Sequence, residues 1–94
     1  MEGQNVISPE VTARYAADAA REVPGVTRIV EGVRKGVRLG DDGSVELHLA
    51  VAWGESLPTV AAEVQARVSE YLERMADVTV TAVNVVVEEL DGRP

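Results

Sequence analysis

Two stretches of the chain repeat apolar residues at the three- and four-residue spacing of a buried helix face. The first begins after Ser8-Pro9-Glu10, which combines a hydroxyl N-cap, a proline in the first turn and an early acid. Pro24-Gly25 ends it. Its apolar positions are Val11, Tyr15, Ala16, Ala19, Ala20 and Val23. The second helix is predicted over residues 57–75, with an apolar stripe at Leu57, Val60, Ala61, Val64, Val68, Tyr71, Leu72 and Met75.

Three other stretches have the period-two pattern of strands. Residues 45–53 alternate, with Val45, Leu47, Leu49, Val51 and Trp53 on one face and Glu46, His48, Ala50 and Ala52 on the other. The turn signal Asp41-Asp42-Gly43 joins this strand to a short one at residues 36–39. A last strand is predicted over residues 78–88. Its valines change parity after Val80, so we expect a bulge near Thr81–Ala82.

This order, α-β-β-α-β, predicts an α+β fold in a single domain spanning residues 1–94. We expect two helices packed on one face of a three-stranded mixed sheet, because each helix has only one apolar stripe. A right-handed crossover through the second helix makes the last strand parallel to the strand at 45–53. We expect the strand at 36–39 to lie between these two, and the parity of Trp53 places its side chain in the core.

Composition narrows the function classes. The net charge of −7 disfavours nucleic-acid binding, and the absence of cysteine removes thiolate chemistry and cysteine zinc sites. Valine occupies 18 positions and phenylalanine none, so the core consists of small branched side chains with little room for a cofactor pocket. The polar N-terminus is unlike a secretory signal, and no apolar run approaches the ~18 residues that span a bilayer. We therefore expect a cytoplasmic protein that binds no cofactor and does not insert into the membrane.

Several short motifs occur in a fixed order along these elements. The chain has Ile-Ser-Pro-Glu-Val at 7–11, Val-Pro-Gly-Val at 23–26, Trp53-Gly54 with Leu57-Pro58, then Val64-Gln65 and Val68 in the second helix, and Val-Asn-Val at 83–85. In this order they resemble the alkaline-shock (Gls-type general stress) family. The resemblance implies a role in envelope stress and homeostasis in Gram-positive bacteria. It also implies self-association and membrane recruitment through an integral-membrane partner, and it brings no catalytic residues with it.

The residues themselves contain no convincing catalytic, cofactor or metal site. His48 lies beside Glu46 on the polar face of its strand, where too few further ligands accompany it for a metal site. Ser44 and His48 are four strand residues apart, roughly 13 Å, which is too far for a nucleophile and its base. Asp41-Asp42 is explained by the turn, and Asn84 by a structural role. We expect a non-enzymatic protein.

Four of the nine cations fall in one segment of this acidic chain, at Arg28, Arg34, Lys35 and Arg38. They are the candidate partner-docking residues, although a solvated charge run is the simpler interpretation. Two functions remain open. One is an envelope-stress or envelope-homeostasis protein that acts through self-association and a membrane-anchored protein partner. The alternative is a small nucleic-acid-binding regulatory domain that uses the basic segment, which the overall charge and the scarcity of aromatics disfavour.

Overall fold

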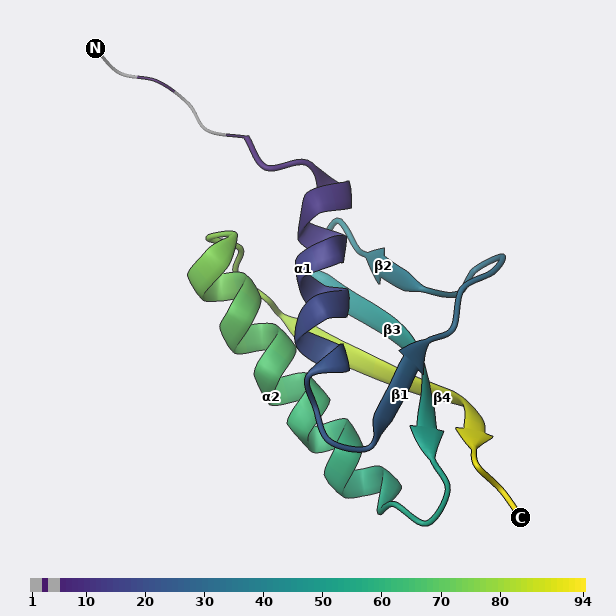
Figure 1. The fold of residues 1–94 in the computed structure, drawn as a ribbon. Helices are drawn as coiled ribbons and strands as arrows, with labels where there is room; N and C mark the ends of the chain where they lie inside the picture. Colours follow the sequence, from purple (N-terminus) through teal and green to yellow (C-terminus); the bar gives the residue numbers. More distant parts are fainter. Residues whose placement is uncertain (1–2, 4–5) are drawn as a thin grey trace.

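The computed structural model describes residue 3 and residues 6–94. Its elements are α1 (Pro9–Arg21), β1 (Val26–Ile29), β2 (Val37–Leu39), β3 (Ser44–Ala52), α2 (Leu57–Met75) and β4 (Ala82–Asp91). Both helices lie on the same face of one sheet (Figure 1). The predicted α+β class is confirmed, with four strands in place of three. The additional strand, β1, has only four residues and no clear alternation in its sequence.

The predicted strand order is wrong. β3, the strand expected at one side, is the centre of the sheet. β1 and β2 both pair with it in antiparallel orientation along one edge, and β4 pairs with it in parallel along the other. The parallel pairing of β4 with β3 is as predicted. β3 takes the centre because its nine residues are long enough to pair with both β1 and β2 along one edge, whereas β2 has only three residues.

β1 and β2 follow one another along the same edge of β3, and residues 30–36 form a loop between them. Three backbone hydrogen bonds close this loop. The Val30 N–H donates to the His48 carbonyl at 2.8 Å, the His48 N–H donates to the Gly36 carbonyl at 3.0 Å, and the Gly36 N–H donates to the Val30 carbonyl at 2.8 Å. The two short strands therefore act together as one interrupted edge strand.

The predicted bulge lies elsewhere. β4 begins at Ala82, so residues 78–81 precede the strand. The chain turns away from α2 at Asp77, whose φ is 52°. The register of β4 shifts further along, where Leu49 faces Val87 and the next residue, Ala50, faces Glu89. Glu88 is the extra residue of this bulge. The change of valine parity that suggested a bulge near Thr81–Ala82 reflects the turn out of α2.

The start of α1 follows the predicted capping chemistry, and α2, for which no cap was predicted, begins in the same way. The Ser8 hydroxyl accepts the Val11 N–H at 3.2 Å, and the Ser56 hydroxyl accepts the Thr59 N–H at 3.4 Å. Each helix has a proline in its first turn. The bounds of α2 coincide with the predicted range. Among the described residues, neither helix combines the length and apolar character needed to cross a membrane.

The core lies between the helices and the sheet, and small side chains fill it. The buried cluster comprises Ala16, Ala17, Ala19, Ala20, Val23, Ile29, Val45, Leu47, Leu49, Val51, Val60, Val64, Val68 and Leu72. Tyr15 and Tyr71 meet edge to face between the helices, with ring centroids 5.8 Å apart. The expectation that Trp53 belongs to the core is wrong, since it is 47% exposed. β3 ends at Ala52, so the alternation does not extend to residue 53.

We predict that Leu72→Ala lowers the free energy of unfolding by about 2–5 kcal/mol, because Leu72 is fully buried and its truncation leaves a cavity. Met75 lies on the same helix and is 45% exposed, so Met75→Ala should change it by only about 0.5 kcal/mol. Urea denaturation of both variants measures the difference. Equal losses would contradict the packing described above.

Candidate functional site

The face of the sheet turned away from α1 and α2, here called the open face, carries most of the side-chain ion pairs of the described residues. Alternate residues of β3 point towards it, among them Glu46, His48 and Ala50. Ala50 is fully buried all the same, and His48 is only 8% exposed. Charged side chains from the strands and loop on both sides of β3 cover Ala50 and His48. The open face is therefore covered by a layer of polar side chains.

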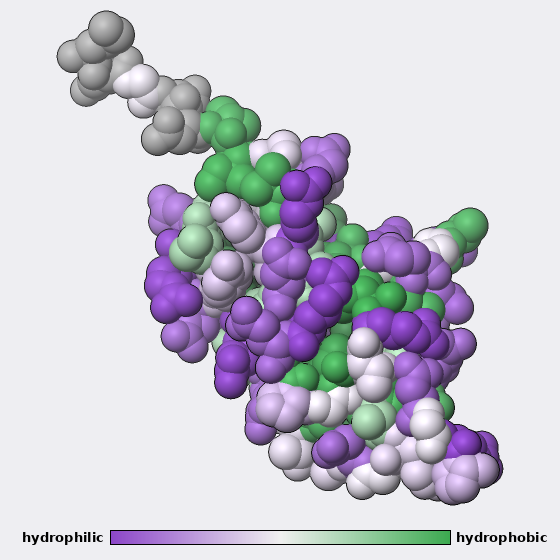
Figure 2. Space-filling model, viewed as in Figure 1, coloured by the Kyte–Doolittle hydropathy of each residue, from purple (hydrophilic) through white to green (hydrophobic). Residues whose placement is uncertain are grey.

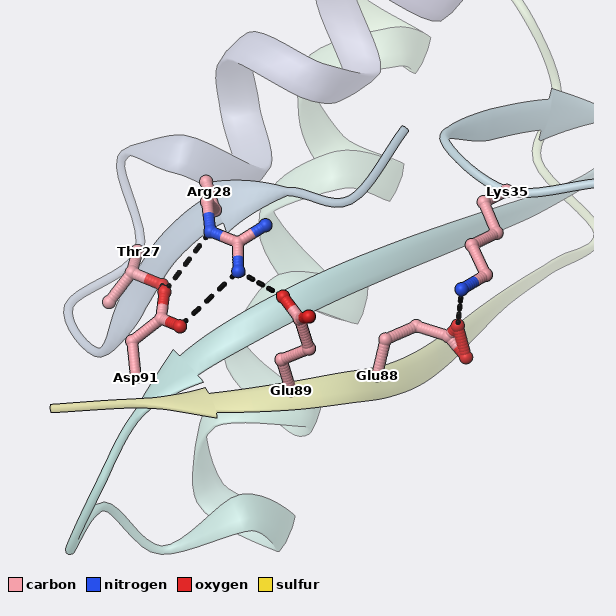
Figure 3. A network of polar contacts seen from close by, with 6 residues as sticks. All are labelled: Thr27, Arg28, Lys35, Glu88, Glu89 and Asp91. Atoms are coloured by element: carbon pink, nitrogen blue, oxygen red, sulfur yellow. Dashed lines mark hydrogen bonds and ion pairs between the residues drawn. The ribbon is translucent and has the colours of Figure 1, made fainter. Parts of the chain in front are cut away.

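The first group of contacts lies over Ala50. Arg28 of β1 and Glu89 of β4 both face Ala50 in the strand register, from opposite sides, and the Arg28 Nη2 atom pairs with the Glu89 carboxylate above it. The Arg28 Nε atom also lies 3.2 Å from an oxygen of Asp91, which accepts the Thr27 hydroxyl at 2.6 Å (Figure 3). These contacts join β1 to β4 across the central strand.

Hydrogen bonding changes the acid–base properties of this group. The Thr27 hydroxyl, and after it the Arg28 guanidinium, hold the pKa of the Asp91 carboxyl below its ordinary value. The pKa of Arg28 is raised by its contacts with Glu89 and Asp91. Both charges are thereby stabilised in the folded state. The side chains remain one-third to one-half exposed, so each ion pair contributes little to stability.

The second group surrounds His48, which lies between two carboxylates. Its Nε2 atom is 2.8 Å from Glu46 Oε2, so His48 lies beside Glu46 as strand parity predicts. Its Nδ1 atom is 3.6 Å from Glu88 Oε2, which also lies 3.3 Å from Lys35 Nζ. These two contacts of Glu88 are ion pairs without hydrogen-bond geometry, so His48 Nδ1 and Glu88 Oε2 have no hydrogen-bond partner within the described residues. Arg38 Nη1 approaches Glu46 at 4.0 Å.

The four candidate docking residues lie along one side of the open face. Arg28 is on β1 and Arg38 on β2, while Arg34 and Lys35 are in the loop at residues 30–36. Arg28, Lys35 and Arg38 each lie within 4.0 Å of a carboxylate of β3 or β4. These cations therefore alternate with acids and do not form a uniform basic patch. The pairing of Arg28 with Glu89 and of Lys35 with Glu88 was not predicted from the sequence, because these acids lie on β4, more than fifty residues further along the chain.

Apolar residues stand out at two places on the surface. Figure 2 shows a hydrophobic tip on the loop between β1 and β2, where Val33 is 89% exposed. At the end of β3, Trp53 lines a shallow pocket with Leu57 and Leu90. The Arg93 guanidinium covers the indole, 5.1 Å from its ring centroid. Trp53 is therefore a surface aromatic.

Asp42 of the turn before β3 and the hydroxyl of Ser44 contact each other and not His48, among the hydrogen bonds of the part of the chain that the structure describes. The Ser44 hydroxyl donates to Asp42 at 2.6 Å, a contact within the turn, and this contact is the chief cause of the lowered pKa of Asp42. No three residues among His, Asp and Glu come together there as metal ligands. What the open face provides is a row of fixed charges of both signs.

Comparison with known proteins adds a family and a fold. Residues 32–91 match the model of the alkaline-shock protein 23 family, described as having a cell envelope-related function. The uncharacterized protein YqhY of Bacillus subtilis strain 168 is 34% identical over 99 aligned residues, covering 88% of this chain and 73% of YqhY.

Solved structures of the MamM CTD have a similar fold. One variant has a TM-score of 0.64 at 19% identity, covering 87% of this chain and 93% of its own. Another has a TM-score of 0.63 at 16% identity, covering 94% of this chain and 100% of its own. At these identities the likeness concerns the fold alone.

We predict that Asp91→Asn lowers the thermal midpoint at pH 7, and that the difference from wild type fades as the pH falls below about 4. A carboxyl with a depressed folded-state pKa contributes stability above its unfolded pKa and loses it as the pH falls through the folded value. Thermal melts from pH 7 to pH 2.5 measure this. Glu63→Gln, on the exposed side of α2, is the control. A difference that stays constant with pH would contradict the proposed contacts of Asp91.

Proposed function

Because this chain belongs to the alkaline-shock protein 23 family, whose function is cell envelope-related, we propose that it acts in envelope stress or envelope homeostasis. In this proposal it is not an enzyme. It works through self-association and through binding to a membrane-anchored protein, from the cytoplasmic side. The resemblance to a Bacillus protein fits a Gram-positive setting.

The observation that carries the proposal is the row of charges on the open face. His48 is the only histidine, and it is buried between Glu46 and Glu88, where a substrate has little access to its ring. A fixed pattern of paired charges suits recognition of another protein, because charge complementarity governs specificity and the rate of association. These features favour an interaction surface over an active site.

We propose that Arg28, Arg34, Lys35 and Arg38 form the docking site for the protein partner. They lie on one side of the sheet, next to the exposed tip of the loop at 30–36. A partner with acidic side chains would exchange with the carboxylates that now pair with Arg28, Lys35 and Arg38. Arg34 would meet it directly from the loop.

We predict that replacing all four cations by serine reduces recovery of the partner from the solubilised membrane fraction of the native host. The main cause is slower association, so high salt should reproduce the loss. The control variant replaces Arg14, Arg21, Arg67 and Arg74 of the helices by serine, which changes the net charge equally. Mass spectrometry of crosslinked complexes measures the recovery.

The double variant Arg34→Ser and Arg38→Ser keeps the pairs of Arg28 and Lys35 and therefore tests docking with least disturbance of the sheet. It should lose part of the recovery while its circular dichroism spectrum matches wild type. If this double variant and the variant that replaces all four docking cations both recover the partner as well as wild type, the interface lies elsewhere.

The alternative of nucleic-acid binding makes a different prediction. Phosphates would have to displace Glu46, Glu88 and Glu89 from the basic side chains against a net charge of −7. We therefore expect no gel shift of generic RNA or DNA at low salt and micromolar protein. A gel shift that disappears when the four docking cations are replaced by serine would favour the regulatory function instead.

A further inference from the structure

β4 forms an edge of the sheet that is continuous over ten residues, Ala82–Asp91. The other edge is divided into β1 and β2 by the loop at residues 30–36. Within the described residues, β4 pairs only with β3. A long edge strand presents backbone donors and acceptors that can bind a further strand.

The hydrogen bonds of β3 indicate which groups of β4 point outward. The N–H and C=O of His48 bond to Gly36 and Val30, so even-numbered residues of β3 direct their backbone groups towards the edge of β1 and β2. Odd-numbered residues then face β4. Leu47 lies opposite Val85, and in a parallel pair its bonds go to the two neighbours of Val85. Val83, Val85 and Val87 therefore direct their backbone groups to the outer edge.

This edge lacks the usual protection against pairing. Residues 82–87 contain no charge and no proline, in a chain of which 27% is charged. The Gln65 amide of α2 donates to the Val83 carbonyl at 3.1 Å, so one outward acceptor is covered by an exposed side chain. The bulge at Glu88 shifts the register by one residue, so the alternation of outward backbone groups is regular only over residues 82–87, although β4 continues to Asp91.

We propose that two copies of this chain pair along β4 in antiparallel orientation, with a two-fold axis at Val85. The inference rests on the proposed self-association and assigns it a surface. In this register Val85 faces Val85 of the second copy and Val83 faces Val87. The outward backbone groups of all three residues therefore form hydrogen bonds with the same groups of the second copy. The two sheets join into one continuous sheet, with the helices of both copies on the same side.

Charge placement favours this register. With the axis at Val85, Glu88 of one copy lies opposite Ala82 of the other, and Glu89 lies opposite Thr81, so the acids avoid each other. The two copies still repel through their net charges of −7. Added salt should therefore strengthen self-association by screening this repulsion, while it weakens docking through the basic side chains.

The first test is Val85→Pro, measured by sedimentation equilibrium from low to high micromolar protein at two salt concentrations. Proline removes an N–H that points outward, and a proline on an edge strand leaves the pairing with β3 intact. We expect the wild type to dimerise and the variant to dissociate about tenfold more readily, because two intermolecular hydrogen bonds per dimer are lost. Val85→Ala, which keeps the N–H, is the matched control.

A second test does not depend on tolerance of proline. In this register Asn84 of one copy faces Val86 of the other, on the open face. Asn84→Asp with Val86→Lys brings opposite charges together twice, whereas Asn84→Lys with Val86→Lys brings like charges together. The first pair should dimerise more tightly than the second, by about tenfold. Circular dichroism establishes that both are folded.

The outcomes separate the two levels of the proposal. A wild type that stays monomeric at high micromolar concentration in both salts overturns self-association and the interface with it. A wild-type dimer that is unaffected by Val85→Pro, and indifferent to the sign of the charge at position 84, keeps self-association and overturns pairing along β4.

Discussion

The structure depends on the hydrogen bonding of β3 along both of its edges. Its residues from Leu47 to Val51 are buried, so backbone groups left unpaired there would cost the fold free energy. β1, β2 and the two ends of the loop at 30–36 supply partners on one side, and β4 supplies them on the other. The helices then need to cover only one face. Every other element is placed by its relation to this strand.

On the second face, charged side chains take the place that a further layer of helices holds in larger α/β domains. Arg28 and Glu89 reach each other across Ala50 because alanine has no side chain beyond Cβ to separate them. Lys35 and Glu88 make a similar contact from the loop to β4. Each pair is weak, yet together they hold segments that share no backbone hydrogen bonds.

Sequence patterns predicted the local parts of the fold. Both helices follow from their apolar spacing, α1 also from its serine cap, and β3 follows from its alternation. The crossover rule correctly gave a parallel β4. The strand order did not follow, because β1 is four residues long with Thr27 and Arg28 inside it, and such a segment resembles a loop. The position of Trp53 depended on where β3 ends, which alternation alone does not determine.

The site shows the same division between local and distant information. Strand parity placed His48 next to Glu46, because both lie on one strand. The contact of His48 with Glu88 could not be predicted, because it depends on a bulge whose position is set by the pairing of β3 with β4. The acids that accompany Arg28 lie more than sixty residues away in the chain. A single sequence gives no periodic signal for contacts of that kind.

The loop between β1 and β2 is closed at its base, and this has a consequence for how related chains can diverge. Val30 and Gly36 bond both to each other and to His48, so the ladder of the sheet is complete on either side of the excursion. The residues beyond that base take no part in the ladder. Insertions or deletions at residues 31–35 should therefore leave the sheet unchanged, so related chains can differ in the length and charge of this one loop without losing the fold.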